Sequence, residues 1–177
     1  MIKFLALWHK THRMLKPLLF ISLISLNGFA QISNYPERTG DISFDERLDK
    51  KDFRLCYEKY VFQYFNNSEG LTYEGEKWAI LQAFSEKYKP EGMSKESGFV
   101  RIRFIVNCKG ETDRFRILAS DENLQEKVFD KAITDQLLQI SKELKGWKPK
   151  KFNGVLYDYY QYLIFKIENG QIKEILP

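Results

Sequence analysis

The amino-acid sequence predicts an α+β domain in which helices pack on one face of a small antiparallel sheet. Three observations predict this class. Apolar and polar residues alternate in residues 99–108 and again in 112–120, as in a hairpin with one buried face. Apolar residues recur at helical spacing before and after this pair. A third alternating run covers 158–167, so the predicted order is β-β-α-β, with a further strand at 171–176 as an open alternative.

Residues 1–30 have the pattern of an export signal. The first 17 residues carry four cations and no acid, and the apolar run "LLFISLISL" follows. Gly28 and Ala30 then fit the small-residue rule, which predicts cleavage between Ala30 and Gln31 and a periplasmic or secreted protein. An uncleaved membrane anchor is the weaker alternative, because the apolar-leaning residues 18–30 fall short of the ~20 that span a bilayer.

Removal of this segment changes the chemistry that is available to the protein. It takes four of the positive charges and both histidines, His9 and His12, so the net charge of +4 falls to zero. The net positive charge of the full chain therefore predicts neither a nucleic-acid partner nor binding to an anionic membrane surface. Without histidine, the protein lacks the usual general base and the commonest metal ligand, and no phosphate-binding motif occurs. We expect no enzyme activity, no cofactor and no metal.

A hydrolase that uses carboxylates is the remaining enzymatic alternative. Adjacent or closely spaced acids occur as Asp121 with Glu122 and as Glu74 with Glu76. Each pair lies at the start of a predicted helix, and acids are common at that position because they interact favourably with the helix dipole. We interpret them as solvated helix starts.

Two cysteines, Cys56 and Cys108, remain in the exported chain. An even count in an oxidising compartment favours one disulfide, which would contribute about 4 kcal/mol in the chain-entropy account. Two buried free cysteines are the alternative. A redox-active pair is disfavoured because the residues do not form a C-x-x-C motif.

The polar segment 31–52 is predicted to be a tail or linker that precedes a single domain over 53–177. The first part of this domain, residues 53–93, is predicted to be helical. Its first helix is expected over 53–65, where apolar residues recur at three- and four-residue steps: Phe53, Cys56, Tyr57, Tyr60, Val61, Tyr64 and Phe65. A second helix ends before Pro90 and is expected to bury Trp78, Leu81, Phe84 and Tyr88.

The rest of the domain, residues 94–177, is predicted to form the sheet. The first strand buries its even positions: Val100, Ile102, Phe104, Val106 and Cys108. A turn at 107–110 uses Gly110, and the second strand buries Phe115, Ile117 and Ala119. A helix over 121–144 is expected to cover this hairpin.

The last long strand is the tyrosine-rich run 158–167. Alternation places Tyr159, Leu163, Phe165 and Ile167 on the buried side, with Gln161 as an exception. Asp158, Tyr160, Tyr162 and Lys166 lie on the other side, with Ile164 as an exception. An Asn-Gly turn at 169–170 would allow residues 171–176 to pair back antiparallel.

These features together resemble the TonB C-terminal domain over residues 75–177. The resemblance rests on Gly98, the alternating strand, the turn "NCKG", the single helix, "WKP" at 147–149, "NG" at 153–154 and the long final strand. It implies a non-enzymatic periplasmic recognition module whose last strand accepts a peptide of an outer-membrane transporter by strand addition. The edge residues in that arrangement are Tyr159, Tyr160, Gln161, Tyr162 and Leu163.

The chain departs from the pattern of TonB itself. TonB has an uncleaved membrane anchor and a proline-rich spacer, whereas this chain has a predicted cleaved signal and five scattered prolines. The extra strand at 171–176 would also lie where a peptide binds. We therefore expect a protein partner in the cell envelope, no permanent membrane anchor and no nucleic acid, with the oligomeric state left open.

A basic face is independent of the resemblance. Four arginines alternate outward on the predicted hairpin: Arg101, Arg103, Arg114 and Arg116. One interpretation is a solvated face neutralised by nearby acids such as Glu111, Asp113 and Asp158. The other is an arginine and tyrosine platform for an anionic ligand of the envelope, by analogy with proteins that combine stacking and charge.

Overall fold

The computed structural model describes residues 41–57, 60–63, 71–90 and 95–176, which form an α+β domain. The predicted class is confirmed. The predicted cleavage site, Ala30 and Gln31, lies outside the described residues. Within the described part, no helix is long and apolar enough to cross a membrane.

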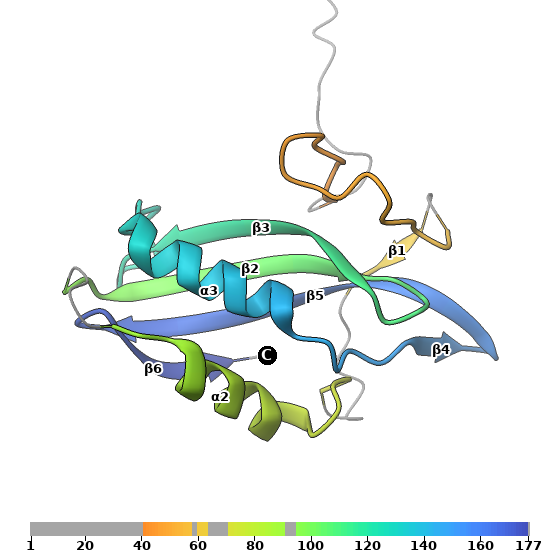
Figure 1. The fold of residues 1–177 in the computed structure, drawn as a ribbon. Helices are drawn as coiled ribbons and strands as arrows, with labels where there is room; N and C mark the ends of the chain where they lie inside the picture. Colours follow the sequence, from red (N-terminus) through yellow and green to blue (C-terminus); the bar gives the residue numbers. More distant parts are fainter. Residues whose placement is uncertain (1–40, 58–59, 64–70, 91–94, 177) are drawn as a thin grey trace, which may run out of the picture. The chain divides into compact units, whose positions relative to one another are not determined.

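The sheet is built around β5 (Val155–Glu168), the tyrosine-rich strand (Figure 1). β5 pairs antiparallel with β2 (Gly98–Val106), and β2 pairs antiparallel with β3 (Thr112–Ser120). Three shorter strands also pair with β5: β4 (Lys150–Phe152), β6 (Gln171–Leu176) and β1 (Val61–Phe62). β1 runs parallel to β5, so the prediction of a purely antiparallel sheet is wrong at this strand. A parallel neighbour needs a long connection, and here most of the domain lies between β1 and β5.

Two helices, α2 (Glu76–Lys87) and α3 (Lys131–Glu143), lie on the same face of the sheet (Figure 1). Between them and the sheet lies the main core, which includes Ile80, Phe84, Ile102, Phe104, Ile133, Leu137, Leu163 and Phe165. The buried face predicted for α2 is confirmed at Phe84. It is wrong at Trp78, which is 66% exposed, because Ile80 and Phe84 form the contact with the sheet.

α3 begins at Lys131 and not at Asp121 as predicted. Residues 121–130 form a loop because the Asp121 carboxylate accepts the backbone N–H groups of Asn123 and Gln125, and Ser120 bridges to Glu126. Such side-chain bonds compete with helix formation. Asp130 is the N-cap of the helix, because its carboxylate accepts the N–H of Ala132.

Both Asn-Gly turns close hairpins. Asn153 and Gly154 have φ values of 49° and 81°, and Asn169 and Gly170 have 51° and 77°. Positive φ at both central residues defines the type I′ turn, whose twist matches that of the flanking strands. The second turn joins β5 to β6, so the predicted terminal hairpin is confirmed.

The helix predicted over 53–65 is wrong wherever the structure describes it. Residues 53–57 have an irregular backbone, and Val61–Phe62 form β1. The apolar stripe was misleading because these residues face two different surroundings. Phe53, Leu55 and Val61 pack on the sheet, whereas Tyr57 and Tyr60 are exposed.

Gly98, the first residue of β2, lies in close contact with the backbone of β3. Its φ is 139°, and a Cβ atom there would clash with the carbonyl oxygen of Ser120. We expect Gly98→Ala to lower the free energy of unfolding by at least ~3 kcal/mol, because it adds steric overlap to backbone strain. Gly154→Ala is the matched control, since Gly154 also has a positive φ but has no atom within 4 Å of the added Cβ. Urea unfolding with the disulfide intact measures both, and equal losses would contradict the role of Ser120.

Candidate functional site

A buried carboxylate, that of Asp158, ties three parts of the chain together. Its Oδ2 accepts the backbone N–H groups of Cys56 (2.7 Å) and Tyr57 (2.8 Å), and its Oδ1 accepts that of Cys108 (2.9 Å). Asp158 has no exposed surface. A buried charge is tolerated when its oxygens are hydrogen-bonded, and here three donors satisfy them.

The disulfide between Cys56 and Cys108 is confirmed and lies beside this carboxylate. The Cα atoms are 6.1 Å apart, inside the usual range, and the bond closes a separation of 52 residues. The two sulfurs and the Asp158 carboxylate form the one cluster of metal-ligating residue types found among the described residues. Because both sulfurs are oxidised, they are not available as thiolate ligands.

Residues 41–57, here called the N-terminal strap, lie against the face of the sheet opposite to the helices (Figure 1). This segment belongs to the predicted tail and to the start of the predicted helix. A small second core joins it to the sheet through Ile42, Ile105 and Tyr160. The Tyr160 hydroxyl accepts the N–H of Ile42 and donates to Asp41. The strap therefore packs as a layer of the domain.

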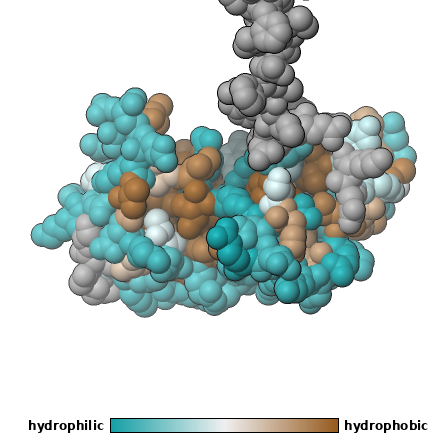
Figure 2. Space-filling view, turned by 90° about the horizontal axis from the view of Figure 1, so that it is seen from above, coloured by the Kyte–Doolittle hydropathy of each residue, from teal (hydrophilic) through white to brown (hydrophobic). Residues whose placement is uncertain are grey.

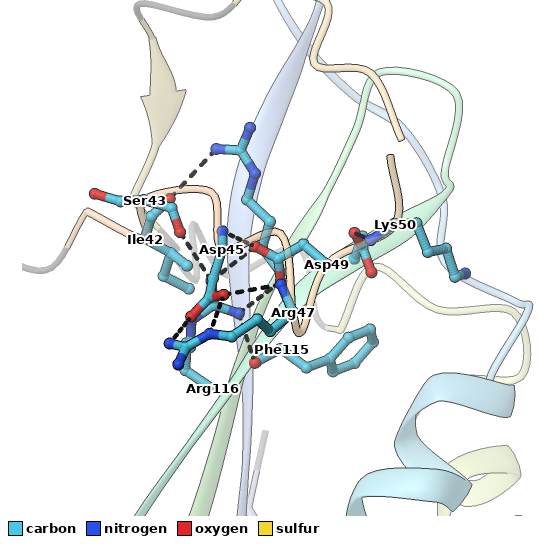
Figure 3. Close-up of polar contacts among 10 residues, drawn as sticks. Ile42, Ser43, Asp45, Arg47, Asp49, Lys50, Phe115 and Arg116 are labelled. Atoms are coloured by element: carbon cyan, nitrogen blue, oxygen red, sulfur yellow. Dashed lines mark hydrogen bonds and ion pairs between the residues drawn. The ribbon is translucent and has the colours of Figure 1, made fainter. Parts of the chain in front are cut away.

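An ion pair between Asp49 and Arg116 holds the middle of the strap (Figure 3). The guanidinium donates to both carboxylate oxygens, at 2.7 and 2.8 Å, and also to the carbonyl of Ser43. Burial acts to raise the pKa of Asp49, but the bonds from Arg116 and from the Asp45 backbone lower that pKa below its ordinary value. The same bond to Asp49 raises the pKa of Arg116.

Two other arginines of the predicted basic face also have partners, and one of these partners belongs to the strap. Arg114 donates to the carbonyl of Ile42, and Arg103 donates to Gln63 and stacks over the ring of Tyr160. Arg116 pairs with Asp49, an acid that the sequence interpretation did not include among the neutralising residues. Arg101 is the member of the four that lies beyond the strap, and it is exposed.

The residues predicted to offer a strand edge lie between two ladders of the protein's own strands. Tyr159 pairs with Phe62 of β1, and the β6 ladder begins at Ile164. Gln161 and Leu163 are buried under the helices, and Tyr160 is buried under the strap. Four of the five predicted edge residues are therefore buried, and their side chains are not available to a partner: Tyr159, Tyr160, Gln161 and Leu163. Tyr162 is half-buried.

The acids considered for hydrolysis have structural positions. Asp121 organises the loop before α3, and Glu76 is the first residue of α2. Glu74 is exposed just before that helix. Glu76 and Glu122 are exposed as well, so these acids face solvent.

An apolar groove lies where β1 meets the β4–β5 hairpin. It has a volume of about 400 Å³ and is lined mainly by aromatic side chains: Tyr57, Tyr60, Phe62, Phe152, Val155 and Tyr157, with Asn153. The rings of Phe62 and Tyr157 are 4.5 Å apart, and those of Phe62 and Phe152 are 6.5 Å apart. We call it the aromatic groove.

The aromatic groove was hidden in the sequence because its residues come from separate segments. Phe152 and Val155 flank the turn of a hairpin, and Tyr57, Tyr60 and Phe62 seemed to belong to a helix. One local sign was present. Apolar residues stand on both sides of a tight Asn-Gly turn, a place where polar residues are usual.

Comparison of the chain with protein-family models, with curated proteins and with solved structures found no match.

Replacing Asp158 by asparagine tests the central carboxylate. The amide has the same shape but only one acceptor oxygen, so at least one of the three buried N–H groups would face an NH₂ group. We expect Asp158→Asn to lower the free energy of unfolding by about 3 kcal/mol. Hydrogen exchange of the amides of Cys56, Tyr57 and Cys108 would accelerate. Asp52→Asn, an exposed change in the strap, is the control, and an equal effect there would contradict this role.

The Asp49–Arg116 pair predicts a loss of stability in acid. The pKa of Asp49 is lowered by folding, so its stabilisation is complete above the unfolded value of 3.8 and disappears as the pH falls through the folded value. We expect Asp49→Asn to cost about 2 kcal/mol at pH 7 and much less near pH 2. Urea unfolding of both proteins at the two pH values measures this. Burial raises the pKa of Asp113, and the charge of Asp49 adds to this rise, so the titration of Asp113 also differs between the two proteins. A constant difference would exclude the ion pair as the cause.

Proposed function

We propose that this protein is an exported, non-enzymatic binding module of the cell envelope that captures an extended segment of a partner protein in the aromatic groove. The observation that carries the proposal is the groove itself. Five of its apolar side chains are between 39% and 61% exposed: Phe62, Tyr57, Val155, Tyr60 and Phe152. A contiguous exposed patch of this kind marks interaction sites in soluble proteins. The disulfide is compatible with an oxidising compartment such as the periplasm.

The groove is a better candidate than the two sites expected from the sequence. Two of the four arginines are bonded to the strap, and a third donates to Gln63 and stacks on Tyr160. The expected strand edge is limited to residues 160–163, between the β1 and β6 ladders. A partner on the arginine face would have to displace existing hydrogen bonds, and a partner strand would have only a short stretch to pair with. In the aromatic groove, by contrast, five apolar side chains are exposed to solvent: Tyr57, Tyr60, Phe62, Phe152 and Val155.

The groove is also held in position before any partner arrives. The N–H of Tyr57 is fixed by Asp158, and the Tyr60 N–H donates to the carbonyl of Tyr57. On the opposite wall, the type I′ turn fixes Phe152 relative to Val155. Binding to a preorganised site loses less conformational entropy, and aromatic side chains commonly provide the strongest contacts in interfaces.

Charge indicates the chemistry of the partner. Lys150 pairs with Tyr157 and therefore lies on the same face of the β4–β5 hairpin as Phe152. An extended segment that alternates aromatic or aliphatic residues with acids would fill the groove and place a carboxylate near this lysine. The proposal thus retains peptide recognition, as the TonB resemblance implies, but moves it from the centre of the last strand to its beginning.

A fluorescent peptide that alternates phenylalanine with glutamate tests the proposal by anisotropy titration against the disulfide-bonded protein. We expect saturable binding that Phe152→Ser weakens at least tenfold, because a central aromatic contact is lost. A peptide with lysine in place of glutamate should bind more weakly than the glutamate peptide, and added salt should reduce the difference.

Leu118→Ser is the matched control, because Leu118 is an equally exposed apolar residue on β3, outside the groove. It should leave the affinity unchanged. The proposal would be wrong if neither peptide saturates the protein, or if Phe152→Ser and Leu118→Ser weaken binding equally.

A further inference from the structure

A second apolar hollow lies on the outer face of the sheet, beyond the strap. It has a volume of about 430 Å³ and is lined by Phe99, Arg101, Leu118, Ala119, Ser120, Leu124, Ile164 and Leu176. We call it the Arg101 trough. Figure 2 shows hydrophobic residues exposed in patches between hydrophilic ones on the face seen from above. Leu118 is 64% exposed and Leu124 is 73% exposed.

The strand register explains why this trough forms. Arg101 pairs with Leu118 of β3 on one side and with Ile164 of β5 on the other, and Ile164 pairs with Leu176 of β6. Directly paired residues share a face of the sheet, so these four form one row across four strands. In the next row, Phe99 lies between Ser120 and Lys166. One guanidinium therefore stands in an apolar row.

Arg101 is chemically different from the other cations nearby. Arg116 is paired with Asp49, Arg103 donates to Gln63, and Lys166 is paired with Glu168 at 2.9 Å. Within the described part of the chain, Arg101 has no hydrogen-bonding or ion-pair partner, and it is exposed. The trough thus holds one positive charge that the protein does not neutralise.

The loop that forms one wall of the trough contains a residue with a strained backbone. Leu124 has a φ of 62°, in the left-handed region that branched side chains seldom adopt. Its N–H donates to the carbonyl of Asp121, whose carboxylate fixes the rest of this loop. The loop holds a strained leucine against solvent, where burial does not repay the strain. An observed outlier of this kind is grounds for a functional hypothesis.

We propose that the Arg101 trough binds an alkyl carboxylate, with the hydrocarbon chain along Leu118, Ile164, Leu176 and Leu124 and the carboxylate on the guanidinium of Arg101. A guanidinium donates two parallel hydrogen bonds to a carboxylate, which matches a single negative charge. The surrounding side chains match a hydrocarbon chain of the size that a hollow of this volume accepts. The trough is separate from the aromatic groove, so this proposal does not depend on that one.

A second copy of the chain is a less suitable occupant. Two copies that met through this face around a two-fold axis would bring equivalent rows together. The unneutralised Arg101 of each would then approach the other, and like charges repel in such an arrangement. A polyanion is equally poorly matched, because the trough offers one cation among apolar side chains.

Titration of the isotope-labelled, disulfide-bonded protein with decanoate, below its micelle concentration, tests the proposal by NMR. We expect saturable shifts of the amides of Phe99, Arg101, Leu118, Leu124 and Ile164. Arg101→Gln should weaken decanoate binding about tenfold, since a charge-assisted bidentate contact is lost. Leu118→Ser should also weaken it. Decanol, which lacks the charge, should bind wild type and Arg101→Gln equally.

Two variants control for general effects. Lys131→Gln removes an exposed cation at the start of α3, and Phe152→Ser removes an apolar side chain from the aromatic groove. Neither should change decanoate affinity. The proposal is overturned if Arg101→Gln binds decanoate as tightly as wild type, or if the shifts map to the aromatic groove. It is also overturned if sedimentation shows a dimer that Leu118→Ser dissociates and decanoate does not affect.

Discussion

The carboxylate of Asp158 is the interaction on which the rest of the structure depends. It lies at the start of the central strand, where β5 leaves its hairpin with β4 and joins β1 and β2. By accepting three backbone N–H groups, it fixes the chain before β1 and the turn after β2 to the same point. The disulfide links these two segments covalently. A carboxylate can take this central position because it offers several acceptor sites in one compact group.

The two faces of the sheet follow from this arrangement. On one face the helices bury a conventional apolar core. On the other, the strap is held at its end by Asp158 and in its middle by Arg116, and it covers only part of the sheet. β5 is therefore buried on both sides over much of its length. Tyrosine suits such a strand, because Tyr159 packs inward and donates to the carbonyl of Lys148, while Tyr160 packs outward under the strap.

Regular alternation in the sequence was sufficient to predict much of this fold. The β2–β3 hairpin, the inward set of β5 residues and the terminal hairpin at Asn169 and Gly170 all follow from period-two patterns and turn chemistry. Local hydrogen bonds defeated the helical predictions. Asp121 turned the expected first part of α3 into a loop, and Asp158 held residues 56–57 in an irregular conformation. The sequence does not indicate these hydrogen bonds, because the bonds depend on partners that only the fold brings near each acid.

The candidate sites were less predictable than the fold for a related reason. Arginines on alternate positions of a hairpin share a face, and this could be predicted from the sequence. The sequence did not indicate that the polar segment around Asp49 would bond two of them, Arg114 and Arg116, or that Arg103 would donate to Gln63. What the strap leaves uncovered is decided by where it is attached. It is fixed near Asp158 and Arg116, so Arg101 with Leu118 and the hairpin residues around Phe152 remain accessible on either side. The position of one buried carboxylate thus decides which apolar surfaces of this protein face solvent and can bind.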